Sequence, residues 1–327
     1  MISRRLLWGI CALAFYFLWA GAVTCYGQAL ERIIVSYPAK TITSFFVPEV
    51  ARQKGFFREE GLDVQMTYVR SGGVEIAAML SGEVDYTVGG ATAINAIVAG
   101  APLRLAIGYI NRVDHLLLAN PKFKTLKDLK GQVIGAQNPG GMINIIVKEI
   151  FNKNGLDSDR DVTLINMGGT QERYISLKSG AAAATLLGIP QSFSAEKEGF
   201  RKLAAAGDYV PGFSGLVIRS EQVTKKPEQV KRMVRASLKA LGFIRQNPQE
   251  TAQMIGRVFQ MTPDIAQMTY DQLVVIISPD GMMNLPGLQF FIDLARERQK
   301  IAKEISSSQI VELAPLREVR GAMGLAR

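Results

Sequence analysis

Short apolar runs alternate with stretches of helical spacing over residues 33–219. Such alternation is typical of α/β folds with largely parallel strands. A first series predicts strands over 33–36, 63–68, 86–89 and 104–109, and helices over 45–54, 74–80 and 91–98. A second series predicts strands over 132–136, 162–166, 183–187 and 216–219, and helices over 142–153, 171–178 and 191–198.

The two series repeat one another at an offset of 98 residues over their central part. At this offset Val64 matches Val162, Thr87 matches Thr185, Gly90 matches Gly188, Met79 is equivalent in kind to Leu177, and the Ser-Gly pair at 81–82 recurs at 179–180. The matches come in the same order within the same succession of strand, helix and turn. We infer from this repeat that the chain forms two similar lobes.

The pattern after Arg219 is mainly helical. Val230, Val234, Leu238 and Leu241 recur at helical spacing within 227–246 and predict a packing stripe. Further helices are predicted over 248–259, 263–275 and 287–304. We expect these helices to wrap one lobe.

The N-terminal residues 1–29 have the layout of a secretory signal. Arg4 and Arg5 precede an apolar run over 6–23, and no acidic residue occurs before Glu31. Small residues at 27 and 29 predict cleavage after Ala29. An uncleaved membrane anchor is an alternative, because the run approaches the ~20 residues that span a bilayer. A lipoprotein anchored through Cys25 is another.

Charge and cysteine content narrow the function classes. Removal of the leader lowers the formal net charge from +9 to +7, and this excess is spread along the chain, so nucleic-acid binding gains little support. A positive field attracts anionic ligands, although general surface charge is the commoner explanation. Both cysteines, Cys11 and Cys25, lie in the predicted leader. A chain beginning at Leu30 therefore has no disulfide, cysteine nucleophile or thiolate metal site.

Motifs for catalysis and cofactor binding are absent from the sequence. His115 is the only histidine, so neither a histidine zinc cluster nor a Cys–His pair can form, and we expect His115 to lie in a hinge or core. The chain has no G-x-S-x-G elbow, no phosphate-binding G-x-x-x-x-G-K-[ST] loop and no G-x-G-x-x-G fingerprint. We predict no catalytic residue, no metal and no cofactor.

Candidate ligand-binding residues follow from position, because ligands of open α/β sheets bind beyond the carboxyl ends of the strands. In the first lobe the candidates are Tyr37, Thr43, Ser44, Gly72, Gly90, Ala91, Thr92 and Tyr109. In the second lobe they are Asn138, Pro139, Gly140, Gly141, Gly169, Thr170, Gly188 and Pro190.

Some of these candidates have two readings. The loop 138–141 suits an anion or carbonyl, because glycines admit a ligand to the backbone and a helix begins at Met142, but it also suits an ordinary turn. Tyr37 and Tyr109 could contact a flat ligand or cap the core. Arginines could neutralise an anionic group or make weak surface pairs; the candidates are Arg70, Arg112 and Arg173.

Three segments resemble a known family. They are VARQKGFFREEGLDV at 50–64, AAMLSGEVDY at 77–86 and LKDLKG at 126–131. Together they resemble the periplasmic solute-binding proteins for nitrate, taurine and alkanesulfonates, over roughly residues 31–305.

The resemblance implies an α/β fold of the type II periplasmic-binding-protein kind, with two lobes, a hinge and a ligand cleft between them. The implied crossings fall near 112–119 and 212–219, which gives a leader at 1–29, a first lobe at 30–115 and 216–327, and a second lobe at 116–215. The resemblance further implies a periplasmic monomer that delivers a small molecule to an ABC permease. Its ligand could be a sulfonate, another small anion or a pyrimidine-like heterocycle. The positive charge and the helix N-termini favour an anion or carboxylate.

Two other functions use the same fold. Thiamine-pyrimidine synthases are similar over much of their length, but they carry a cysteine-rich motif that this sequence lacks after residue 30. A ligand-sensing subunit of a surface receptor would use the same cleft and differ only in its partner.

Overall fold

The computed structural model describes residues 29–69 and 72–325, and the chain from Glu31 to Arg327 forms a compact unit apart from Met1–Leu30. Residues 1–28 of the predicted leader lie outside the described residues. No helix of the described residues is long and apolar enough to cross a membrane.

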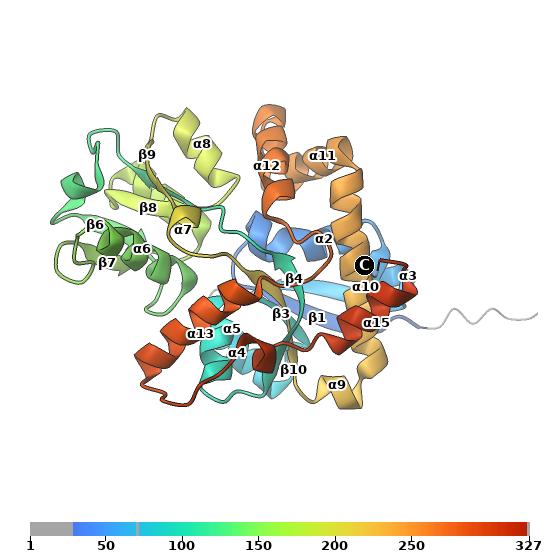
Figure 1. Ribbon diagram of the computed structural model, residues 1–327. Helices are drawn as coiled ribbons and strands as arrows, with labels where there is room; N and C mark the ends of the chain where they lie inside the picture. Colours follow the sequence, from blue (N-terminus) through green and yellow to red (C-terminus); the bar gives the residue numbers. More distant parts are fainter. Residues whose placement is uncertain (1–28, 70–71, 326–327) are drawn as a thin grey trace, which may run out of the picture. The chain divides into compact units, whose positions relative to one another are not determined.

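Two five-stranded sheets organise the described chain, and we name each lobe by its sheet (Figure 1). The first lobe has the order β2-β1-β3-β10-β4, built from β1 (Glu31–Tyr37), β2 (Leu62–Tyr68), β3 (Tyr86–Gly89), β4 (Leu103–Ile110) and β10 (Ser214–Arg219). The second lobe has the order β7-β6-β8-β5-β9, built from β5 (Leu116–Ala119), β6 (Val133–Ala136), β7 (Thr163–Asn166), β8 (Ala184–Leu187) and β9 (Arg201–Ala205).

The two sheets share one plan. In each, the second strand of the order (β1 or β6) pairs in parallel with both of its neighbours, and the fourth strand (β10 or β5) runs antiparallel to both of its own. The last strand (β4 or β9) therefore runs parallel to the first three. The register is also matched, because Ser36 lies opposite Thr87 in the first sheet and Gly135 lies opposite Thr185 in the second. The two similar lobes predicted from the sequence repeat are therefore present.

Helices cover the sheets and begin where strands end. The first lobe carries η1 (Ile42–Phe46), α2 (Val47–Gln53), α3 (Phe56–Glu59), α4 (Gly72–Ser81) and α5 (Ala91–Val98). The second lobe carries η2 (Leu126–Leu129), α6 (Met142–Lys153), α7 (Thr170–Ser179), α8 (Gln191–Lys197) and η3 (Ala206–Asp208). The remaining helices are α9 (Gln222–Lys225), α10 (Pro227–Gln246), α11 (Pro248–Phe259), α12 (Pro263–Ile276), α13 (Leu285–Gln299), α14 (Ser307–Ile310) and α15 (Ala314–Ala322).

The predicted stripe on α10 is the buried face of that helix. Val230, Val234, Leu238 and Leu241 are all at most 3% exposed and belong to the apolar core of the first lobe. Proline at the start of α10 suits a helix N-terminus, where its missing N–H has no intrahelical partner. The C-terminal helices pack mainly on the first lobe, as expected, although α12 also contacts α8 of the second.

The predicted strands need one correction and two additions. The strand predicted over 216–219 with the second series is β10, which begins at Ser214 and inserts antiparallel between β3 and β4 of the first sheet. Strands β5 and β9 were not predicted. The sequence of β9, Arg-Lys-Leu-Ala-Ala, lacks β-branched and aromatic residues, so its strand state depends on pairing with β5.

Candidate ligand-binding cleft

A cavity of about 760 Å³ is lined by loops and helix starts from both lobes. It lies beyond the carboxyl ends of β1, β3, β6 and β7, where parallel α/β sheets bind ligands. Among the predicted site residues, those that line it are Thr43, Ser44, Gly72, Gly90, Ala91, Thr92, Asn138, Pro139, Gly140, Gly141, Gly169 and Thr170. The tertiary structure thus brings together loops that are far apart in the sequence.

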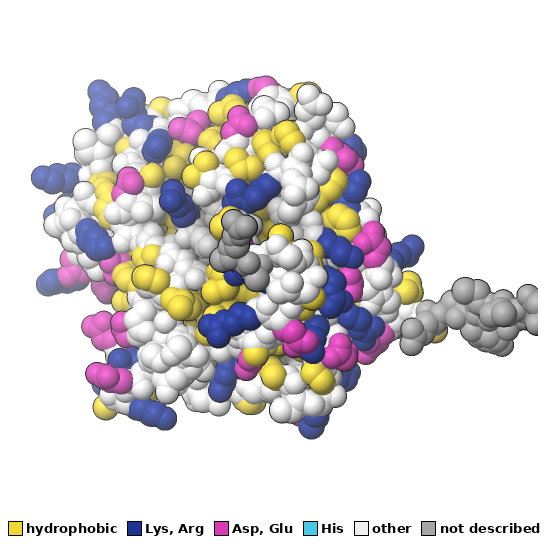
Figure 2. Space-filling model, turned by 45° about the vertical axis from the view of Figure 1, so that its right-hand side comes forward, with side chains coloured by type: hydrophobic (Ala, Val, Ile, Leu, Met, Phe, Trp, Pro, Cys, Tyr) yellow, Lys and Arg dark blue, Asp and Glu magenta, His cyan; other side chains and the backbone are white. Residues whose placement is uncertain are grey.

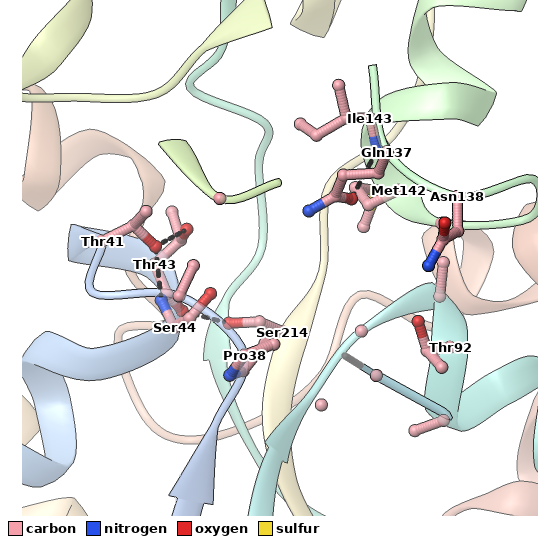
Figure 3. Close-up of a pocket in the computed structure, with 18 of the residues that line it drawn as sticks. Pro38, Thr41, Thr43, Ser44, Thr92, Gln137, Asn138, Met142, Ile143 and Ser214 are labelled. Carbon is pink, nitrogen blue, oxygen red and sulfur yellow. Dashed lines mark hydrogen bonds between the residues drawn. The ribbon is translucent and has the colours of Figure 1, made fainter. Parts of the chain in front are cut away.

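The first-lobe wall carries a group of hydroxyls after β1 (Figure 3). Thr41 precedes η1, and its Oγ1 accepts a hydrogen bond from the Ser44 amide at 3.3 Å while lying 3.2 Å from Thr43 Oγ1. The Ser214 hydroxyl donates to the Thr43 carbonyl at 2.8 Å. Because Ser214 begins β10, the second crossing between the lobes is attached directly to this wall.

The second-lobe wall is the turn before α6, which lies opposite the hydroxyl side chains of the first-lobe wall in Figure 3. Gly140 has a φ of 84°, a left-handed conformation that favours glycine. Gln137 Oε1 accepts a bond from the Ile143 amide at 3.3 Å and so satisfies one free donor of the helix start. Asn95 of α5 donates to the Gly140 carbonyl at 2.9 Å, which joins the two lobes beside the cavity.

Tyr37 and Tyr109 do not line the cavity, contrary to prediction. Tyr109 is 1% exposed, and its hydroxyl lies 2.9 Å from Ser237 Oγ on α10, so burial raises the pKa of this phenol. Strand β4 is buried on both of its faces, so this ring packs into the core. The Tyr37 ring packs against Phe45, with 4.6 Å between ring centroids, and also against Tyr68.

Gly188 and Pro190 are also absent from the lining, because the first crossing occupies their side of the cavity. A Cβ built on Gly188 would lie 3.2 Å from ring atoms of His115. Asp114 Oδ2 accepts a hydrogen bond from the Ile189 amide at 3.1 Å, and its Oδ1 lies 2.8 Å from His115 Nδ1. Asp114 and His115 therefore line the cavity in place of the two predicted residues.

The candidate arginines have different surroundings. Arg112 lines the cavity and is exposed, whereas Arg173 lines it and is only 1% exposed. Arg173 donates to the carbonyls of Leu186 at 3.2 Å and Gly168 at 2.9 Å and to Thr170 Oγ1 at 3.3 Å. Burial lowers the pKa of its guanidinium to about 10. Arg70 lies outside the described residues.

A carboxyl that the sequence reasoning missed lies in the first-lobe wall. Glu75, in the first turn of α4, is 3% exposed and lines the cavity. Its Oε1 accepts hydrogen bonds from Ser36 Oγ at 2.9 Å and from Thr87 Oγ1. Burial raises the pKa of Glu75 to about 7, while these two hydrogen bonds act to lower it. The available signal was spacing, because Glu75 shares the buried face of α4 with Met79 one turn later.

The surface does not concentrate one sign of charge on the face shown in Figure 2, where Lys and Arg are interspersed with Asp and Glu. Within residues 29–69 and 72–325, no group of three or more His, Cys, Asp and Glu side chains is placed to hold a metal ion.

Two sheets of matched plan with a cavity lined from both define the periplasmic binding protein fold, and solved structures of that class are similar over most of the chain. The alkanesulfonate-binding protein SsuA of Xanthomonas axonopodis, bound to MOPS, has a TM-score of 0.70 at 18% identity, covering 88% of this chain and 99% of its own. The nitrate-binding protein NrtA of Synechocystis has a TM-score of 0.72 at 15% identity, covering 90% and 89%. The predicted fold is confirmed.

The family follows from the sequence. Residues 43–251 match the family model described as NMT1/THI5 like, so the chain belongs to the NMT1/THI5-like family. A putative binding protein of Brucella abortus is 26% identical over 232 residues, which is 70% of this chain and 70% of that protein.

Proposed function

We propose that this protein is the extracytoplasmic solute-binding component of an ABC importer. One observation carries the proposal: a single cavity of about 760 Å³ is lined by equivalent loops from both repeated lobes. A small molecule held there contacts both lobes only when they are together, so its binding favours the closed arrangement. A permease that recognises this arrangement would then receive the solute.

The relatives support transport. Two similar structures belong to proteins named for binding an alkanesulfonate and nitrate, and a sequence relative is named a putative binding protein. The contact between Asn95 and Gly140, and the ion pair between Lys197 of α8 and Asp264 of α12, join the lobes where closure would bring them together.

Ligand capture is tested by thermal unfolding of the purified protein against sulfonates, nitrate, carboxylates, pyrimidines and amino acids. A ligand bound only by the folded form stabilises it by RT ln(1 + [L]/Kd), so a saturable rise in Tm is expected. The solute released by denaturing the protein as isolated is identified in parallel by mass spectrometry. Failure of both measurements to find a bound solute would contradict the proposal.

Enzymatic activity of the thiamine-pyrimidine-synthase type is the alternative on this fold, because the family name includes THI5. We propose binding without turnover, since the described residues that line the cavity include no cysteine and one histidine, which lies beside Asp114. Recovery of a bound compound unchanged is expected. Its chemical conversion would show that the enzyme reading is correct.

Export is the second part of the proposal and rests on residues 1–29. The mass of the protein recovered from the bacterial envelope is expected to correspond to a chain that begins at Leu30. A full-length mass would indicate an anchor, and a lipidated mass beginning at Cys25 would indicate a lipoprotein.

A further inference from the structure

Two of the buried charged residues that line the cavity, Glu75 and Arg173, occupy equivalent positions of the internal repeat. Glu75 and Arg173 are 98 residues apart, which is the offset of the repeat, and α4 (Gly72–Ser81) and α7 (Thr170–Ser179) are displaced by the same offset at both ends. Each residue is the fourth of its helix, and both line the same cavity. The duplicated fold thus places one acid and one base at matching points of the two walls.

Among the described residues, the carboxyl of Glu75 has hydrogen-bond partners but no cationic partner. Both hydroxyl donors contact Oε1, and within the described residues Oε2 accepts no hydrogen bond. The shift in the pKa of Glu75 has no contribution from a charged neighbour, and no ion pair forms with the described cations. A buried carboxylate without a cation is costly, so a positive group from outside the protein is its natural partner.

The guanidinium of Arg173 has no ion-pair partner among the described residues, although the charge of the adjacent Glu172 acts to raise its pKa. Its three hydrogen bonds go to two carbonyls and one hydroxyl, all uncharged, and it forms no ion pair with any described carboxylate. Arg173 also lies in the first turn of α7, whose N-terminus favours an anion at the same place. An arginine in this position suits a planar or tetrahedral oxyanion.

We infer that the ligand is a small amphoteric molecule whose cationic nitrogen contacts Glu75 and whose carboxylate, sulfonate or similar oxyanion contacts Arg173. This inference rests on the proposed solute-binding function and deepens it. The other charged groups of the cavity do not take these roles, because Asp114 and His115 lie against each other and Arg112 is exposed.

Matched pairs of probes test the inference. They are 2-aminoethanesulfonate with ethanesulfonate, β-alanine with propionate, and 4-aminobutanoate with butanoate, each pair differing by one amine. Calorimetry of the full chain is expected to show at least one aminated probe binding at least about tenfold more tightly than its partner, since hydrogen bonds to charged groups are among the stronger ones.

Two variants separate ligand contact from a structural role. Glu75→Gln keeps the size and the hydroxyl contacts but is expected to reduce the preference for the aminated probe to within about twofold. Arg173→Lys keeps the positive charge but loses the planar set of N–H donors of the guanidinium. It is expected to weaken the binding of both probes of a pair by about tenfold. The matched controls Glu83→Gln and Arg201→Gln change exposed residues and are expected to leave affinities unchanged.

Proton release on binding distinguishes a ligand contact of Glu75 from a purely structural role, because a structural role would not make the binding enthalpy depend on the buffer. The pKa of Glu75 is about 7, so a cation that pairs with it at pH 7 expels the bound fraction of a proton. The binding enthalpy of the aminated probe should therefore vary with the ionisation enthalpy of the buffer in the native protein and not in Glu75→Gln.

The results that overturn the inference differ from those that overturn the function. Equal binding within every pair, or a co-purified solute without a cationic nitrogen, would leave a solute-binding protein but refute the amphoteric ligand. Absence of any bound solute and of any probe binding would refute both. If the Tm shows that Glu75→Gln is folded, an unchanged preference for the aminated probe would also refute the role of Glu75.

Discussion

Helices α4 and α7 show how two copies of one plan diverge at the cavity. Both helices end in a Ser-Gly pair, and Met79 and Leu177 are fully buried at equivalent places. Their first turns instead carry opposite charges, Glu75 and Arg173. The comparison teaches that the repeat preserves apolar packing and helix ends, whereas the side chains that face the cavity have changed.

The strands beside α4 and α7 differ in the hydrogen-bond partners that they offer to Glu75 and Arg173. Thr87 and Thr185 are equivalent and fully buried, and each hydroxyl lies within hydrogen-bond distance of a backbone carbonyl on the adjacent parallel strand, β1 or β6. The residue opposite Thr87 is Ser36, which supplies a second donor for Glu75. The residue opposite Thr185 is Gly135, which has no side chain and leaves the threonine hydroxyl to bond its carbonyl at 2.8 Å.

Removal of the second-lobe charge should have the largest effect on stability. Arg173→Ala leaves two buried acceptors and the half-buried Gly168 carbonyl without their donor and opens a cavity, so we expect the free energy of unfolding to fall by about 4 kcal/mol. Chemical denaturation measures the change. The control Arg201→Ala, at an exposed site, should stay within about 0.5 kcal/mol, and a similar loss in both variants would contradict the argument.

The first-lobe charge should make stability depend on pH. The Glu75 carboxyl titrates near pH 7 when folded but near its ordinary 4.5 when unfolded, so between these values the folded state binds more protons. The free energy of unfolding should therefore fall by about 3 kcal/mol as pH rises from 4.5 to above 7. Arg173, with a pKa of about 10, should contribute no slope in this range.

Denaturation curves of the native protein and Glu75→Gln at several pH values check this contribution. The difference between the two proteins should change with pH, because the glutamine cannot titrate. Parallel pH profiles would show that Glu75 retains an ordinary pKa.

The substitution Gly135→Ser tests whether the second sheet can accept the serine side chain that the first sheet carries at the equivalent position, Ser36. A Cβ at this position would lie 2.9 Å from Thr185 Oγ1 and 3.1 Å from its Cβ, in a fully buried site. Gly135→Ser should therefore lower the free energy of unfolding by about 2 kcal/mol. A neutral result would show that the strand has room that the packing does not indicate.

The reciprocal change, Ser36→Gly, should have the smallest effect. It removes one hydrogen bond to Glu75 and adds backbone freedom within β1, so we expect a loss of about 1 kcal/mol. The same change should raise the pKa of Glu75 further, because a bond that favours the carboxylate is lost. Carboxyl NMR titration in Ser36→Gly measures it, and an unaltered midpoint would refute the contribution of Ser36.

Local pattern and the repeat were sufficient for much of the fold. The spacing of Val230, Val234, Leu238 and Leu241 located the buried face of α10, and the 98-residue offset indicated two similar lobes. Turn residues after parallel strands located loops on both cavity walls, such as Thr43–Ser44 and Gly140–Gly141. The inferences about the buried face of α10 and about the two lobes succeeded because each depends on a periodicity in the sequence.

What the sequence by itself determined is therefore the succession of elements, their duplication and the edges of the sheets where a ligand would bind. Only the tertiary structure decided which side chains reach the cavity: it turned Tyr109 toward Ser237, placed Asp114 and His115 against Gly188, and buried Glu75 and Arg173 in opposite walls. The physical reason is that periodicity reports which face of an element is buried. Whether that face meets apolar core, a crossing segment or a shared cavity depends on contacts between residues distant in the chain.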